Sequence, residues 1–155
     1  MKEGFIHSLM GDFITHKDFM PLKDEAGNIV TGAVSVLTKQ SFGSLVILEL
    51  IDADRLPVEN ISAILEGNAK RLDGIKGAQC YVFEVFIFDR EPEAEKRRII
   101  DEGQLHRTNS KKYIKCMSVN LEGKAFLKYF KVPVSDFGIG LTITKRLEGK
   151  AEAVP

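Results

Sequence analysis

Two apolar stretches of strand length, each followed by the same kind of turn, most restrict how this chain can fold. The first ends in "ELIDADRLP", from Glu49 to Pro57, and the second in "EVFIFDREP", from Glu84 to Pro92. Each ends in Asp-Arg-x-Pro, in which Asp can accept backbone N–H bonds and Pro sets the first helical φ. Strand-helix-strand crossovers join parallel strands, so the sequence predicts parallel neighbours ending near Ile51 and Phe88.

The rest of the chain continues this alternation of helix and strand patterns. We expect helices over 5–14, from Pro57 to about 72 and from Pro92 to about 103, and strands over 29–39, 45–51, 80–88, 113–121 and 124–132. Residues 104–112 read as a polar loop, and 137–145 as a last strand or an exchanged arm. The prediction is one α/β domain over 1–145, followed by a flexible tail over 146–155.

The expected architecture is a mixed sheet of about five strands, parallel in its centre and flanked by helices. A single domain fits the length of 155 residues. The 22 basic and 22 acidic residues cancel, so the composition contains no strong signal for nucleic-acid binding. The sequence shows neither a signal peptide nor an apolar run that could span a bilayer. Cys80 and Cys116 adjoin apolar runs, and we expect buried, reduced thiols in a cytoplasmic protein.

Four charged residues are expected at one rim of the sheet. They follow the two repeated strands and are Asp52, Asp54, Asp89 and Arg90. Open α/β sheets tend to bind ligands at the carboxyl ends of parallel strands. The rim is therefore a candidate ligand site, although Asp-Arg-x-Pro also serves simply as turn chemistry.

Two glutamates are predicted to lie on an apolar face of the sheet. Side chains alternate along a strand, so Glu49 shares a face with Ile47 and Ile51, and the register of the repeat places Glu84 roughly 5 Å from Glu49. Two buried carboxylates that close need a divalent cation, a shared proton or a basic partner. We expect Lys115 to be that partner if the pair is structural, because its neighbours in "YIKCMSV" are apolar.

The element order and the acidic residues in neighbouring strands resemble restriction-endonuclease-like nucleases. That resemblance implies Mg²⁺ at Glu49, Asp52 and Glu84, with Lys115 as the remaining catalytic candidate. The family's Asp/Glu-x-Lys motif is missing here, because Ile51 and Phe86 stand two positions after the glutamates. A nuclease, or a nucleic-acid-binding remnant of one, is therefore the alternative hypothesis.

A second resemblance covers more of the chain. "GNIVTGAVSVLTK", "LVILELIDADRL", "YVFEVFIFDREP" and "YIKCMSVNLEGKAFLKYF" together resemble the cytosolic amino-terminal domain of Firmicute rhomboid-type intramembrane proteases. That resemblance implies an endonuclease-like fold without nuclease activity and with no cofactor. It implies an accessory or sensing role at the cytoplasmic face of the membrane, with a protein partner or the membrane-embedded part of a longer chain. A homodimer is an alternative assembly. The candidate contact patch is Phe126, Phe130 and Phe137.

Overall fold

The computed structural model of this chain describes residues 2–21, 34–41, 44–73, 79–102, 105–109, 112–122, 125–127 and 137–154. The elements follow the order α1 (Lys2–His16), β1 (Met20–Pro21), β2 (Val34–Ser41), β3 (Ser44–Asp52), α2 (Val58–Asp73), β4 (Gln79–Phe88), α3 (Ala94–Glu102), β5 (Leu105–Asn109), β6 (Lys112–Asn120), β7 (Ala125–Leu127) and α4 (Phe137–Glu152). The predicted α/β class is confirmed.

One mixed sheet of seven strands is present in the described residues. Its order is β1-β2-β3-β4-β6-β5, and β7 also pairs with β6. β3, β4 and β6 run parallel in the centre, and the outer strands pair antiparallel. The predicted parallel pairing of the two repeated strands is thus confirmed. The described sheet exceeds the expected five strands by the two-residue β1 and by β5.

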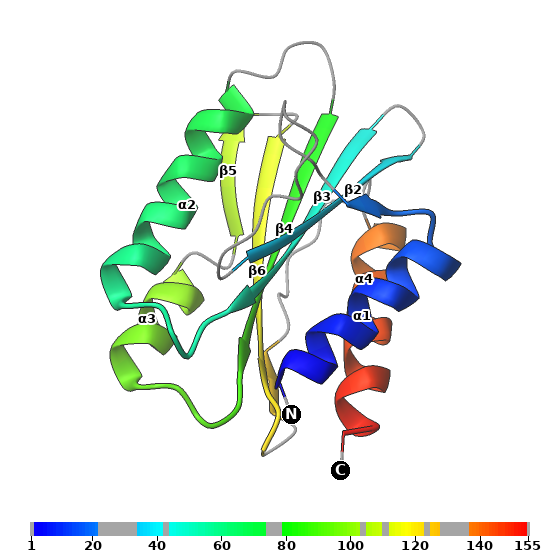
Figure 1. The fold of residues 1–155 in the computed structure, drawn as a ribbon. Helices are drawn as coiled ribbons and strands as arrows, with labels where there is room; N and C mark the ends of the chain where they lie inside the picture. Colours follow the sequence, from blue (N-terminus) through cyan, green and yellow to red (C-terminus); the bar gives the residue numbers. More distant parts are fainter. Residues whose placement is uncertain are drawn as a thin grey trace.

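Helices cover both faces of the sheet, as Figure 1 shows. On one face α1 and α4 pack together over a core cluster that includes Leu48, Phe83 and Met117. On the other, α2 and α3 cover a cluster that includes Ile51, Phe86 and Cys116. This double coverage explains why β4 is buried along nearly its whole length and reads as a continuous apolar run.

Local chemistry sets the ends of the helices. α2 and α3 each begin within two residues after a proline, Pro57 and Pro92, with Glu59 and Glu95 in their first turns. α1 ends where Asp18 takes the left-handed conformation, with a φ of 60°. This turn lets the N–H of Phe19 reach the Phe13 carbonyl at 3.2 Å.

Three sequence predictions in the second half of the chain are corrected. Within the expected polar loop, residues 105–109 form the edge strand β5, because β6 supplies hydrogen-bond partners that the local sequence does not indicate. The expected strand or arm over 137–145 is instead the start of α4, which continues to Glu152 and includes most of the expected flexible tail. Its buried residues Ile143, Leu147 and Ala151 are spaced by four, as on one face of a helix. Only Ile143 lies within 137–145, so this segment by itself does not show the helical spacing.

Some predictions fall outside the described residues. The strand expected from Ile29 is described only from Val34, and the hairpin partner over 124–132 only over β7. The candidate contact patch has no described side chain, because Phe130 and the side chains of Phe126 and Phe137 lie outside the described part.

Candidate functional site

The two Asp-Arg-x-Pro turns meet at the carboxyl ends of β3 and β4. The N–H of Ala53 donates to the Ile87 carbonyl at 3.1 Å, which extends the parallel pairing past the end of β3. Asp54 Oδ2 then accepts a hydrogen bond from the backbone N–H of Asp89 at 2.8 Å. An aspartate of the first turn therefore holds the backbone of the second turn, 35 positions away. The aspartate of the Asp-Arg-x-Pro turn therefore accepts a backbone N–H bond, as expected, but the N–H belongs to the other turn.

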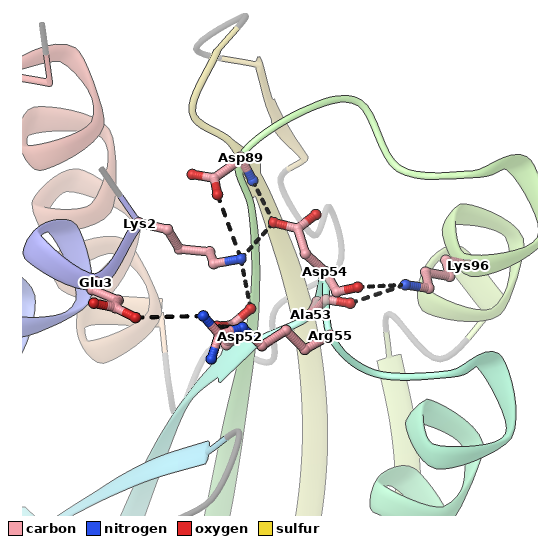
Figure 2. A network of polar contacts seen from close by, with 8 residues as sticks. All are labelled: Lys2, Glu3, Asp52, Ala53, Asp54, Arg55, Asp89 and Lys96. Carbon is pink, nitrogen blue, oxygen red and sulfur yellow. Dashed lines mark hydrogen bonds and ion pairs between the residues drawn. The ribbon is translucent and has the colours of Figure 1, made fainter.

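A lysine from α1 occupies the space between the rim aspartates. Lys2 Nζ lies 2.7 Å from Asp52 Oδ1, 2.6 Å from Asp54 Oδ2 and 3.6 Å from Asp89 Oδ2. Figure 2 shows its side chain reaching from the start of α1 toward these carboxylates. Lys2 is only 6% exposed. The rim thus holds a buried internal cation that ties α1 to the ends of two central strands.

The electrostatics of Lys2 and Asp54 are set by opposing effects. Burial lowers the pKa of Lys2, but its hydrogen bonds to Asp52 and Asp54 and their negative charges prevail and raise it. Burial raises the pKa of Asp54, but the hydrogen bonds from Lys2 and from the Asp89 backbone prevail and lower it. Both groups are therefore held in their charged forms.

Further contacts brace the same turn. Lys96 Nζ of α3 donates to the carbonyls of Ala53 and Asp54 at 3.1 and 3.3 Å. Arg55 Nη2 lies 3.5 Å from Glu3 Oε1 of α1, and Arg55 Nε lies 3.7 Å from Asp52 Oδ2. Arg90, the fourth predicted rim residue, has an exposed side chain. Elements on both sides of the sheet therefore converge on the rim.

The two glutamates lie where the sequence predicts. Glu49 and Glu84 are direct partners in the parallel register of β3 and β4, and they are 3% and 0% exposed. They belong to the face covered by α2 and α3. The Cys116 thiol donates to Glu84 Oε2 at 3.5 Å. Burial raises the pKa of Cys116, and the charges of Glu84 and Glu49 raise it further.

The expectation that Lys115 lies beside these glutamates is wrong. In the register of β4 and β6, Glu84 pairs with Cys116, and Lys115 pairs with Phe83. Lys115 therefore lies on the opposite face, under α1 and α4. Its Nζ lies over the rings of Tyr81 and Phe83, 5.1 and 5.6 Å from their centroids. Burial lowers the pKa of Lys115 to about 7.

The residues of the nuclease hypothesis are thus divided among three places. The two glutamates lie under α2 and α3, Asp52 lies at the rim against Lys2, and Lys115 lies under α1 and α4. Over the part of the chain that the structure describes, no three or more His, Cys, Asp or Glu residues are arranged to hold a metal ion.

Lys2 is the rim residue that sequence reasoning missed. It lies 52 positions from Asp54, and one lysine near the start of an amphipathic helix is not a recognisable signal. A weak indication was available: three aspartates gathered at one rim require a cation. Nothing in the sequence identified which cation it would be.

Comparison of the chain with protein families, with curated proteins and with solved structures found no match. None of the helices in the described residues is long and apolar enough to cross a membrane.

Proposed function

We propose that this chain is a non-catalytic accessory domain that acts by binding a protein partner at the rim of β3 and β4. The proposal keeps the resemblance to the soluble domain of rhomboid-type membrane proteases, and with it a position at the cytoplasmic face of the membrane. The partner it implies is the membrane-embedded protease core. The proposed role requires no cofactor.

The division of the charged residues between the two faces carries this proposal. Metal-dependent phosphodiester cleavage needs carboxylates and a basic group converging on one open position. Here Glu49 and Glu84 are enclosed by one pair of helices and Lys115 by the other, with the sheet between them. Bringing them together would require a strand to shift its register by one residue, which would move every side chain of that strand to the opposite helix layer.

The rim has the properties of a contact surface. Arg55 and Glu3 have side chains 73% and 82% exposed, and Arg90 is exposed beside Asp89. Glu3 follows Lys2 in the chain, and Arg55 contacts both Glu3 and Asp52, so a mixed-charge surface adjoins the buried Lys2. Partners recognise such surfaces through charge complementarity, which sets specificity and association rate.

Binding to a rhomboid-type protease core that lacks its own soluble domain tests the proposal. The core would be held in detergent, and its affinity for the native chain compared with that for Arg90→Ala and Arg55→Ala. We expect saturable binding that both variants weaken without a change in thermal stability. Lys145→Met, on the exposed side of α4, is the control and should bind like the native chain. Absence of binding, or equal binding by all variants, would overturn the proposal.

The nuclease alternative has its own assay. Supercoiled plasmid would be incubated with the native chain and with Glu84→Gln in Mg²⁺ and then in Mn²⁺. The proposal predicts no cleavage by either protein. Metal-dependent nicking by the native chain that Glu84→Gln abolishes would establish the nuclease and refute the accessory role.

Amide NMR during the same titrations locates any metal. Mn²⁺ broadening centred on Glu49 and Glu84 would reopen the nuclease reading. Broadening confined to Asp52, Asp54 and Asp89 would instead assign cation binding to the rim.

A further inference from the structure

Arg55 and Arg90 occupy matching positions in the two turns of the rim. Each follows the aspartate of its own Asp-Arg-x-Pro turn. Both side chains are exposed, that of Arg55 to 73%. The proposed binding depends on both arginines, and a partner meets them together in one geometry only if the two turns keep a constant spacing. The contacts that fix one turn relative to the other therefore decide how the arginines are presented.

Asp54 is the side chain that joins the two turns. Its Oδ2 accepts the N–H of Asp89, the residue before Arg90, at 2.8 Å. The same oxygen accepts a hydrogen bond from Lys2 Nζ at 2.6 Å, and Figure 2 shows Asp54 facing both donors. Because Lys2 is buried, turning the Asp54 side chain away from Asp89 would also break a short contact between opposite charges. Asp54 therefore holds the backbone from which Arg90 projects.

The first turn, which carries Arg55, is fixed by other groups. Lys96 Nζ donates to the carbonyls of Ala53 and Asp54 at 3.1 and 3.3 Å. The Ala53 N–H donates to the Ile87 carbonyl at 3.1 Å. These bonds use the backbone of the first turn and not the Asp54 carboxylate. Loss of that carboxylate should therefore leave the contacts around Arg55 in place and act on the second turn.

The second turn is also bonded to the end of β6. The Glu122 N–H donates to the Asp89 carbonyl at 3.0 Å, and Asn120 Nδ2 donates to Glu91 Oε2 at 2.9 Å. These bonds hold the turn against β6, but they do not connect it to the first turn. Among the described residues, the hydrogen bond that Asp54 accepts from Asp89 makes that connection through a side chain.

We propose that Asp54 is the positioning residue of the rim, which holds Arg90 at a fixed place relative to Arg55 and thereby raises the affinity for the partner. This inference rests on the proposed function. Asp54 does not have to touch the partner, because its carboxylate orders the second turn before binding. Ordering a contact in advance removes a cost of association that corresponds to about 2- to 10-fold in affinity for one side chain.

Amide exchange at the second turn tests the inference without a partner. Asp54→Ala removes the acceptor, whereas Asp54→Asn keeps an oxygen that can accept the Asp89 N–H. We expect the Asp89 amide to exchange slowly in the native chain and in Asp54→Asn, and roughly tenfold faster in Asp54→Ala. The Arg90 backbone should also become more mobile in ¹⁵N relaxation of Asp54→Ala. Native exchange of the Asp89 amide in Asp54→Ala would refute the inference.

Binding to the protease core in detergent tests the functional part. Asp54→Ala should weaken binding by about 2- to 10-fold, and Asp54→Asn should restore most of the affinity although it removes the charge. The control for lost stability is Asp12→Ala, which breaks the contact with Arg146 of α4 and should bind like the native chain. Native affinity of Asp54→Ala, or equal losses in Asp54→Asn and Asp54→Ala, would contradict a positioning role.

Two double-mutant cycles identify the arginine through which Asp54 acts. Arg90→Ala combined with Asp54→Ala should bind no more weakly than Arg90→Ala alone, because no Arg90 side chain is left to position. Arg55→Ala combined with Asp54→Ala should show the product of the two separate losses. Independent losses in the Arg90 cycle would overturn the inference, even if each single variant binds weakly.

The two kinds of measurement separate this inference from the proposed function. Binding of the core by the native chain, with no effect of Asp54→Ala, supports the proposed function and refutes the positioning role. If no version of the chain binds the core, the proposed function fails. The exchange rate of the Asp89 amide then still decides whether Asp54 orders the second turn.

Discussion

Replacement of Lys2 by Met removes the cation at the rim and keeps most of the apolar stem. The three carboxylates around it differ in exposure, with side chains 14% exposed for Asp52, 33% for Asp54 and 41% for Asp89. A buried hydrogen bond between charged groups contributes about 1.5–3 kcal/mol, which applies to Asp52. The more exposed pairs with Asp54 and Asp89 each contribute at most about 1 kcal/mol. The contact with Asp89, at 3.6 Å, contributes the least.

Lys2→Met should therefore lower the free energy of unfolding by about 2–4 kcal/mol. For a chain of this size that corresponds to a Tm lower by about 5–12 °C. Chemical denaturation at pH 7 measures the first quantity and calorimetry the second. The control, Lys145→Met, changes an exposed lysine of α4 and should stay within about 0.5 kcal/mol of the native chain.

A double-mutant cycle with Asp52→Asn isolates the most buried pair. The two substitutions should together cost less than the sum of their separate effects, because either one already breaks the 2.7 Å contact. A Lys2→Met effect below about 0.5 kcal/mol, or strictly additive effects, would refute the view that the rim is a buried electrostatic tie.

The pH dependence of this difference follows from the two shifted groups. The pKa of Asp54 is lowered in the folded chain, so its contribution is present above the unfolded value of 3.8 and is lost as the pH falls through the folded value. The pKa of Lys2 is raised, so its contribution is present below 10.5 and is lost as the pH rises through the folded value. The stability gap between native and Lys2→Met should be constant between these limits and shrink outside them.

Three further predictions concern other parts of the fold. Asp12→Ala should lower the free energy of unfolding by about 1–2 kcal/mol, because the Asp12 side chain is 7% exposed and bonds Arg146 of α4 at 3.0 Å. In a double-mutant cycle with Arg146→Met, measured by urea denaturation, the two effects should be coupled, and additive effects would contradict the prediction. Asp18 has a positive φ, so the Asp18→Val variant should have a free energy of unfolding about 1–2 kcal/mol lower than the Asp18→Gly variant in the same assay. Equal values for the two variants would argue against a left-handed turn. Cys80 and Cys116 are both fully buried, so a thiol reagent should modify them only as fast as the chain opens, and immediate reaction without denaturant would show that they are accessible.

Sequence patterns located much of the central sheet and part of the rim. Strand alternation placed Glu49 and Glu84 on one face, and the repeated turn brought Asp52, Asp54 and Asp89 to one rim; the register and the Lys2 contacts agree with both. These features depend on short-range periodicity and on the handedness of the crossover, which the local sequence determines.

Elements near the carboxyl end could not be predicted in the same way. The segment 137–145 alternates like a strand, yet it is helical because α4 buries one face against the sheet beside α1. β5 has a polar sequence and exists because β6 offers an edge. In both, tertiary packing overrides weak local propensity.

The chain by itself thus determined the α/β class, the parallel centre and the shared face of the two glutamates, because each follows from patterns within a few residues. Tertiary structure alone decided which cation meets which carboxylate. Lys2 reaches the rim only because α1 packs across the sheet. Lys115 lies opposite Phe83, one position from Glu84, so a register shift of one residue reverses the face on which it lies. The repeated turn indicates the register of β3 against β4, but no repeat marks the register of β6 against β4, which follows only from the packing of both helix layers.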